Sequence, residues 1–146
     1  MDVVKVMNRV ALLWRQGMVP GFAGLYRAND AARSIEIDGA ALTSFRVGAP
    51  FDFAERLAAD SGYLAEIDES ARVALPFGGG FVCCGEGAHG SEGFFARLDA
   101  DGDLVWVVFL PDGNPFYEVN VHGSRITCTN NLGRRVSVDL TDELYA

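Results

Sequence analysis

The feature that most constrains this chain is a series of short apolar segments with a period of two between Gly93 and Leu140. Turn signals separate these segments every eight to twelve residues, which is typical of antiparallel strands joined by tight connections. The segment at 104–110, LVWVVFL, is apolar on both of its faces. We therefore expect it to be a central strand that is covered on each side.

The same period extends the strand prediction upstream. From residue 63 onward we expect strands near 63–67, 72–76, 80–85, 94–99, 103–110, 116–121, 125–130 and 134–140. Before them, strands at 34–38 and 41–47 are expected to form a hairpin at Asp38-Gly39, a favoured turn dipeptide. Residues 19–29 are rich in turn formers, and we expect them to be irregular.

Two helices complete the expected fold. A stripe of apolar residues from Val3 to Trp14 follows helical spacing, with a cap at Asp2 and a stop at Gly17. A second short helix is expected over 52–60, after Pro50. The predicted fold class is α+β and mainly β: an antiparallel meander sheet, either strongly curved or sandwich-like, covered by the N-terminal helix.

Length and composition predict one domain over residues 1–146. Apolar residues make up 49% of the chain and charged residues 22%, which is the range of ordinary globular proteins. The N-terminal residues lack the pattern of a secretory signal, and no apolar run is long enough to span a bilayer. We therefore expect a soluble, cytoplasmic protein whose three cysteines are free thiols, with adjacent Cys83 and Cys84 on opposite faces of a strand.

The charge is unevenly distributed along the chain. The net charge is −8, and residues 52–112 hold twelve carboxylates against three arginines. A negative field of this kind repels nucleic-acid phosphates and anionic membrane surfaces, and it attracts basic proteins. The same charge also serves solubility, and the sequence leaves both interpretations open.

Two short patterns suggest chemistry, and their contexts argue against it. Residues 85–90 match G-x-G-x-x-G, but a strand is expected next where a dinucleotide site needs a helix. The alternation Asp99, Asp101 and Asp103 resembles a calcium loop, yet both later positions that such a loop requires are leucine. We expect a hairpin loop in the first case and a tight turn in the second.

The thiols and histidines also fail to form a recognisable site. Cys83, Cys84 and His89 are close in sequence, but the side chains of adjacent cysteines on a strand point in opposite directions and cannot coordinate the same metal ion. Ser91 lacks the G-x-S-x-G turn of a serine nucleophile. We therefore expect no enzyme activity, no catalytic residue, no metal and no cofactor.

One constellation of residues resembles a known family. It combines a W-x-x-F pair, an N-P-F triplet and an N-N-L-G turn, at Trp106, Phe109, Asn114, Pro115, Phe116, Asn130, Asn131, Leu132 and Gly133. Over residues 93–140 this pattern resembles the immunity proteins encoded beside bacterial polymorphic toxins, including those of contact-dependent growth inhibition. The residues also have a structural interpretation, with Trp106 and Phe109 in the core and Asn131 in a left-handed turn.

The resemblance implies a stoichiometric inhibitor that occludes a cognate toxin domain, such as a nuclease with a basic surface. Such a partner fits the acidic segment, since complementary charge accelerates association. The expected contact residues are Glu86, Glu92, Phe94, Phe95, Asp99, Asp101, Asp103 and Asp112. The alternatives are a small ligand- or peptide-binding β module at Gly78–Gly93 and a hydrolase that uses Cys83, Cys84 or His89.

Overall fold

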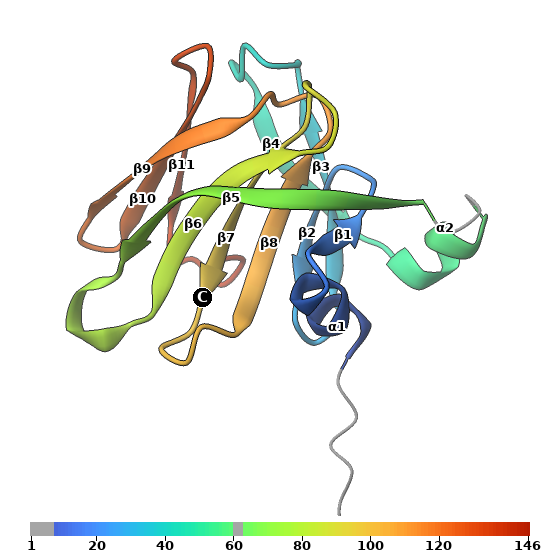
Figure 1. Cartoon of the computed structure of the whole chain (residues 1–146), viewed down its shortest axis with the longest axis horizontal. Helices are drawn as coiled ribbons and strands as arrows, with labels where there is room; N and C mark the ends of the chain where they lie inside the picture. Colours follow the sequence, from blue (N-terminus) through green and yellow to red (C-terminus); the bar gives the residue numbers. More distant parts are fainter. Residues whose placement is uncertain (1–7, 60–62) are drawn as a thin grey trace, which may run out of the picture.

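The structure is a computed structural model that describes residues 8–59 and 63–146. It is mainly β, with two antiparallel sheets and two short helices (Figure 1). The larger sheet has eight strands in the order β1-β5-β6-β7-β8-β2-β3-β4, and the smaller sheet has three in the order β11-β10-β9. Every strand pair is antiparallel, which confirms the predicted fold class.

The helices are α1 (Arg9–Arg15) and α2 (Phe53–Ala59), and a single 3-10 turn, η1, spans Pro76–Gly78. The strands are β1 (Met18–Pro20), β2 (Gly24–Arg27), β3 (Ala32–Ile37), β4 (Phe45–Pro50), β5 (Leu64–Ala74), β6 (Phe81–Gly87), β7 (Gly93–Leu98), β8 (Leu104–Leu110), β9 (Phe116–His122), β10 (Arg125–Asn130) and β11 (Arg135–Asp139). The six strands expected from residue 80 onward are confirmed, and each begins and ends within two residues of its predicted bounds. Among the described residues, no helix is long and apolar enough to cross a membrane.

Strand β8 separates two apolar cores, as its two-sided apolar sequence predicts. Trp106, Val108 and Leu110 face the core that the three-stranded sheet covers. Val107 and Phe109 face the other core, to which α1 contributes Val10 and α2 contributes Phe53. Burial on both faces explains why this strand carries no polar residue.

Helix α1 packs on β1 and β2. Val10 and Leu13 are its buried residues. The Trp14 ring packs edge-on against the Phe94 ring, with 5.8 Å between the ring centroids. Gly17, with φ +74°, follows the helix end as predicted. The predicted cap at Asp2 and the start of the stripe at Val3 lie outside the described residues.

The prediction of irregular structure over 19–29 is wrong, because β1 and β2 form there. Strand β2 lies inside the large sheet, between β8 and β3. A side chain at Gly24 would collide with the Tyr26 ring, so glycine is needed for packing at this position. These strands have only three and four residues, which is too short for a period of two to be recognised.

The predicted tight hairpin at Asp38-Gly39 is replaced by a wider loop. Strand β3 ends at Ile37 and β4 begins at Phe45. The Asp38 carboxylate closes the loop by accepting hydrogen bonds from the Thr43 hydroxyl and the Ser44 amide. Leu42 adopts φ +51° in this loop, and its side chain is buried in the core.

The strands predicted at 63–67 and 72–76 are parts of one long strand, β5, which is drawn in green across Figure 1. Its register shifts between Glu69 and Ala71, which marks a bulge. Ala65 faces one core and Ala71 packs against the other. The exposed polar residues at the bulge interrupt the apolar pattern, so the sequence suggests a turn there.

Candidate functional site

The polar residues of this fold gather at its two ends. We call the connections 38–44, 88–92 and 111–115 together with the turn 131–134 the loop end. We call the connection 75–80 and the β7–β8 turn at 99–103 the hairpin end. These two ends lie at opposite ends of β6 and β7. Phe81 pairs with Leu98 at the hairpin end, and Glu86 pairs with Gly93 at the loop end.

The predicted contact residues do not form one surface. Asp99, Asp101 and Asp103 lie at the hairpin end, whereas Glu86 lies next to the loop end and Asp112 within it. The length of β8 separates the two groups by roughly 20 Å, from the rise of an extended strand. Sequence reasoning grouped them because they are close along the chain.

Three of the predicted contact residues are buried, so their assignment to a partner surface is wrong. Phe94 and Phe95 are 1% and 0% exposed and belong to opposite cores. Glu92 is 3% exposed, and its carboxylate accepts the His89 amide at 3.1 Å within its own loop. Adjacent phenylalanines on a strand that is covered on both faces cannot reach a partner.

Asn130 holds the loop end together. Its side-chain amide donates to the carbonyl oxygens of Ala40 at 2.8 Å and Gly113 at 2.9 Å. Its side-chain oxygen accepts the amides of Leu132 and Arg134 at 3.0 and 2.9 Å. One buried side chain thereby joins three connections that are far apart in sequence.

The motifs behind the family resemblance meet at this end. The Asn114 side-chain amide donates to the Asn131 side-chain oxygen at 3.1 Å, and the Asn131 amide donates to the Pro115 carbonyl at 2.9 Å. Within these motifs the left-handed residues are Asn114 and Gly133, so the prediction that Asn131 is left-handed is wrong. Trp106, Phe109 and Phe116 are buried core residues as expected, and Leu132 is exposed.

The glycine-rich segment serves packing. Strand β7 follows it directly, as expected, and no helix is available to hold a phosphate. A Cβ atom at Gly85 would lie 1.9 Å from the Asp68 carbonyl oxygen, and one at Gly93 would lie 2.0 Å from that of Asn114. The chain's own backbone therefore occupies the space that the alternative of a ligand-binding module requires at these two positions.

The hairpin end carries exposed groups of two kinds. The Asp99 carboxylate accepts the amides of Asp101 and Asp103, both at 2.9 Å, and so shapes the turn. Asp101 is exposed, and Asp103 pairs with Arg15 at 3.2 Å. Phe77 lies in the neighbouring connection with φ +60° and a fully exposed side chain. No sequence pattern singled out Phe77. Its place between Pro76 and three glycines could have indicated it.

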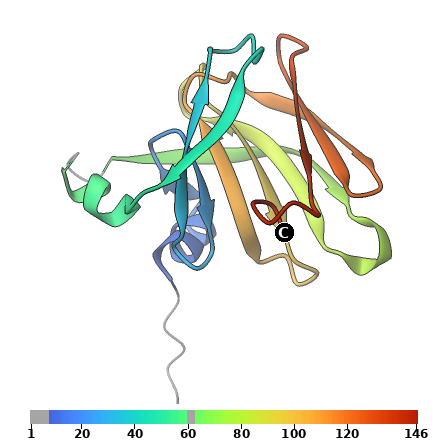
Figure 2. The ribbon, with the colours of Figure 1, turned by 180° about the vertical axis from the view of Figure 1, so that it is seen from behind.

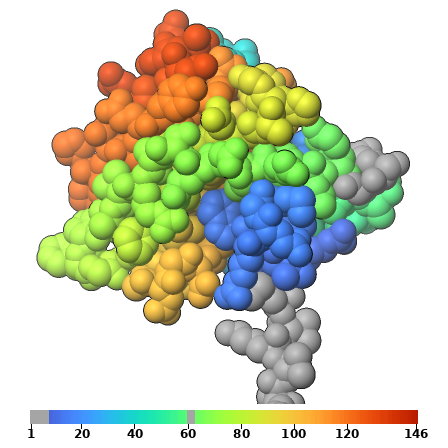
Figure 3. Space-filling view, in the orientation of Figure 1, coloured from blue at the N-terminus to red at the C-terminus, as the bar shows by residue number. Residues whose placement is uncertain are grey.

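Another acidic pair lies on β5 and β6. Asp68 and Glu86 are directly opposite each other in the ladder, and neither has an ion-pair partner among the residues that the structure describes. Like charges at such positions repel each other. Glu66, also exposed, lies two residues before Asp68 on β5, which crosses the front of the space-filling view in green (Figure 3).

The cysteines are buried and free, and Cys83 and Cys84 face opposite cores as predicted. Burial raises the pKa of Cys84 to about 12, with the Glu69 charge adding to the effect. Burial also raises the pKa of Cys83 and Cys128. Since the thiolate is the reactive form, these thiols are poor nucleophiles at neutral pH.

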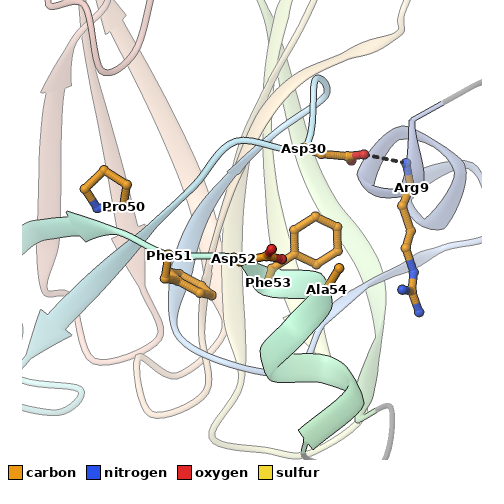
Figure 4. Close-up of a pocket in the computed structure, with 7 residues that line it drawn as sticks. All are labelled: Arg9, Asp30, Pro50, Phe51, Asp52, Phe53 and Ala54. Atoms are coloured by element: carbon orange, nitrogen blue, oxygen red, sulfur yellow. Dashed lines mark hydrogen bonds between the residues drawn. The ribbon is translucent and has the colours of Figure 1, made fainter.

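A shallow hollow of about 580 Å³ lies between α1 and α2. Figure 4 draws the residues that line it. Its two carboxylates have structural roles: Asp30 accepts the amides of Arg9 and Val10, and Asp52 accepts the amide of Glu55. Over residues 8–59 and 63–146, no three histidine, cysteine, aspartate or glutamate side chains are grouped to hold a metal ion. The hollow therefore offers no convergent set of catalytic groups.

Comparisons with known proteins give no relative for this arrangement. No family model, no curated protein and no solved structure matches the chain.

Proposed function

We propose that this protein is a non-catalytic inhibitor that binds a basic partner protein, in the manner of the toxin immunity proteins that residues 93–140 resemble. The partner class is a cognate bacterial toxin domain, such as a nuclease, and the inhibitor acts in the cytoplasm by occluding the toxin in a one-to-one complex. This mechanism requires no metal, cofactor or catalytic residue.

The supporting observation is that folding leaves the described carboxylates of residues 52–112 at the surface, with the exception of Glu92, while it engages the three arginines there. The Arg56 guanidinium lies over the Phe22 ring, 4.4 Å from its centroid. Arg97 turns inward and donates to the Tyr145 carbonyl at 3.0 Å, and Arg72 pairs with Glu69 at 2.9 Å. Asp68 and Glu86 face each other, and no cationic side chain of residues 8–59 or 63–146 pairs with either of them. A basic partner would relieve this repulsion, and its approach would be accelerated by the negative field.

The test is an affinity capture with the tagged protein from its own cells, followed by washes at low and high salt. The expected result is one basic protein that salt releases, that is toxic when expressed alone and that an equimolar amount of this chain neutralises. Asp68→Lys should weaken the complex about tenfold or more at low salt. Glu118→Lys, on the exposed face of β9, serves as the matched control.

Retention of no protein, or of an acidic protein whose binding is insensitive to salt, would overturn the proposal. Equal binding by the Asp68→Lys and wild-type chains at low salt would show that these carboxylates are solubility charge only.

A further inference from the structure

Phe77 has an unusual position at the hairpin end. It lies between Pro76 and Gly78 in the β5–β6 connection, its φ is +60°, and its side chain is 105% exposed. It makes no ring stacking or cation–π contact with any described residue. The chain itself therefore gains no packing from this ring.

The left-handed conformation is unfavourable for a bulky residue and easy for glycine. Gly78, the next residue, is also left-handed, and nothing lies within 4 Å of the position of its missing Cβ. Glycine or asparagine would suit position 77 better than phenylalanine on local grounds alone. No contact with a described residue accounts for an aromatic ring at this position.

Leu42 shows what internal compensation looks like. It is also apolar and left-handed, with φ +51°, but it is only 8% exposed and belongs to the core beneath the three-stranded sheet. Burial of its side chain offsets the backbone strain. Phe77 carries the same type of strain without the burial.

The residues around the connection that carries Phe77 indicate the chemistry of a surface that would bind it. The base of its connection touches the β7–β8 turn, since a Cβ at Gly80 would lie 2.1 Å from the Leu98 carbonyl oxygen and 2.9 Å from the Asp99 Cα. Asp101 in that turn is exposed and has no hydrogen-bonding or ion-pair partner for its carboxylate among the described side chains. An exposed apolar ring and an exposed carboxylate at the same end of the molecule fit a partner surface that has an apolar pocket with basic residues around it.

We propose that Phe77 is the anchor by which this protein docks its basic partner, with the ring inserted in an apolar pocket and Asp101 facing a lysine or arginine at the pocket's rim. This inference rests on the proposed function and adds an apolar anchor at the hairpin end. Asp68 and Glu86, toward the loop end, contribute to the negative field that attracts the partner rather than to this contact. The hairpin end is then the docking surface. In Figure 3 the connection 75–80 protrudes at the left of the view and the β7–β8 turn lies at its lower edge.

The test combines site-specific photocrosslinking with affinity measurements. p-Benzoylphenylalanine is placed at position 77, or at position 132 as a control, because Leu132 is an exposed apolar residue at the opposite end (59% exposed). Illumination in the native cells should join position 77 to the same basic protein that the wild-type chain captures. Position 132 should give no such adduct.

The affinity of the purified basic protein is then measured for wild-type, Phe77→Gly and Leu132→Ala chains. Phe77→Gly should weaken binding about 30-fold or more, the usual loss at an aromatic anchor, without lowering the melting temperature. Leu132→Ala should change affinity less than about threefold. Loss of affinity with unchanged or higher stability is the signature of a residue retained for binding.

The outcomes separate the two proposals. If the wild-type chain captures no basic protein, the proposed function and this inference both fail. If it captures one but Phe77→Gly binds within about threefold of wild type, or the adduct forms at position 132, only this inference fails. An adduct with twice the mass of the chain would show that a second copy covers Phe77, and it would overturn the basic partner as its occupant.

Discussion

The two ends of the molecule place left-handed apolar residues in opposite settings. At the loop end, Leu42 turns into the core, and the surrounding connections are joined through Asn130. At the hairpin end, Phe77 turns out to solvent. The difference teaches that backbone strain must be read together with burial. Strain that packing offsets, as at Leu42, belongs to the fold, and strain without such packing is the observation on which the proposed docking role of Phe77 rests.

The first prediction concerns the base of the hairpin end, where we expect the largest effect. Gly80→Ala should destabilise the protein by about 4 kcal/mol, because φ is +96° and a Cβ would lie 2.1 Å from the Leu98 carbonyl oxygen. Gly78→Ala, with open space around it, should cost only about 1 kcal/mol. Urea denaturation would measure both. Equal losses of stability would mean that the backbone at Gly80 is no more tightly packed than the backbone at Gly78.

The second prediction tests the rigidity of the loop end. Asn130→Ala should destabilise by about 3 kcal/mol, because four backbone groups lose their partner in a buried site. Asn131→Ala, at the exposed neighbouring asparagine, should cost less than about 1 kcal/mol. Calorimetry of the two variants would rank them. A milder effect for Asn130→Ala than for Asn131→Ala would contradict the proposed role of the buried amide.

The third prediction compares the two strained residues directly. Leu42→Gly should destabilise by about 2 kcal/mol, since the lost burial exceeds the relieved strain. Phe77→Gly should leave the free energy of unfolding within about 1 kcal/mol of wild type, or raise it, since strain is relieved and no burial is lost. Thermal unfolding of both variants would measure these two changes in stability. Marked destabilisation by Phe77→Gly would assign the ring to the fold.

The smallest expected effect is a pH dependence at the loop end. The hydrogen bond from the Thr43 hydroxyl, supported by the Ser44 amide, lowers the pKa of Asp38 below its ordinary value of 3.8. Since the folded-state pKa is depressed, the stabilisation is present above pH 3.8 and is lost as the pH falls through the folded-state value. The stability difference between wild type and Asp38→Asn should therefore be largest near neutral pH and shrink in acid. A difference that grows in acid would contradict this sign.

The C-terminal segment adds a contact that no sequence pattern suggests. The Tyr145 carbonyl accepts hydrogen bonds from the Trp106 indole at 2.9 Å and the Arg97 guanidinium at 3.0 Å. Arg27 donates to the Leu144 carbonyl at 2.9 Å, and in Figure 2 the segment, in dark red, lies in front of the strands of the large sheet. Arg27 and Arg97 come from strands on either side of Trp106, so only the folded sheet brings them to this segment.

The sequence by itself determined the fold class, the strands from β6 to β11, the two-sided burial of β8 and the opposite orientation of Cys83 and Cys84. These are consequences of local periodicity, which a single segment contains. It also indicated that the middle of the chain is acidic, since charge is additive along the sequence.

Only the tertiary structure decided which polar residues meet. It divided the predicted contact residues between two ends, buried Phe94 and Phe95, and gave Asn130 its role. The fold brings together residues that are far apart in the sequence, such as Asn130 and Ala40, which are ninety residues apart, and no local pattern encodes such pairing. The exposure of Phe77 is of the same kind, because burial depends on what the rest of the chain places beside a residue.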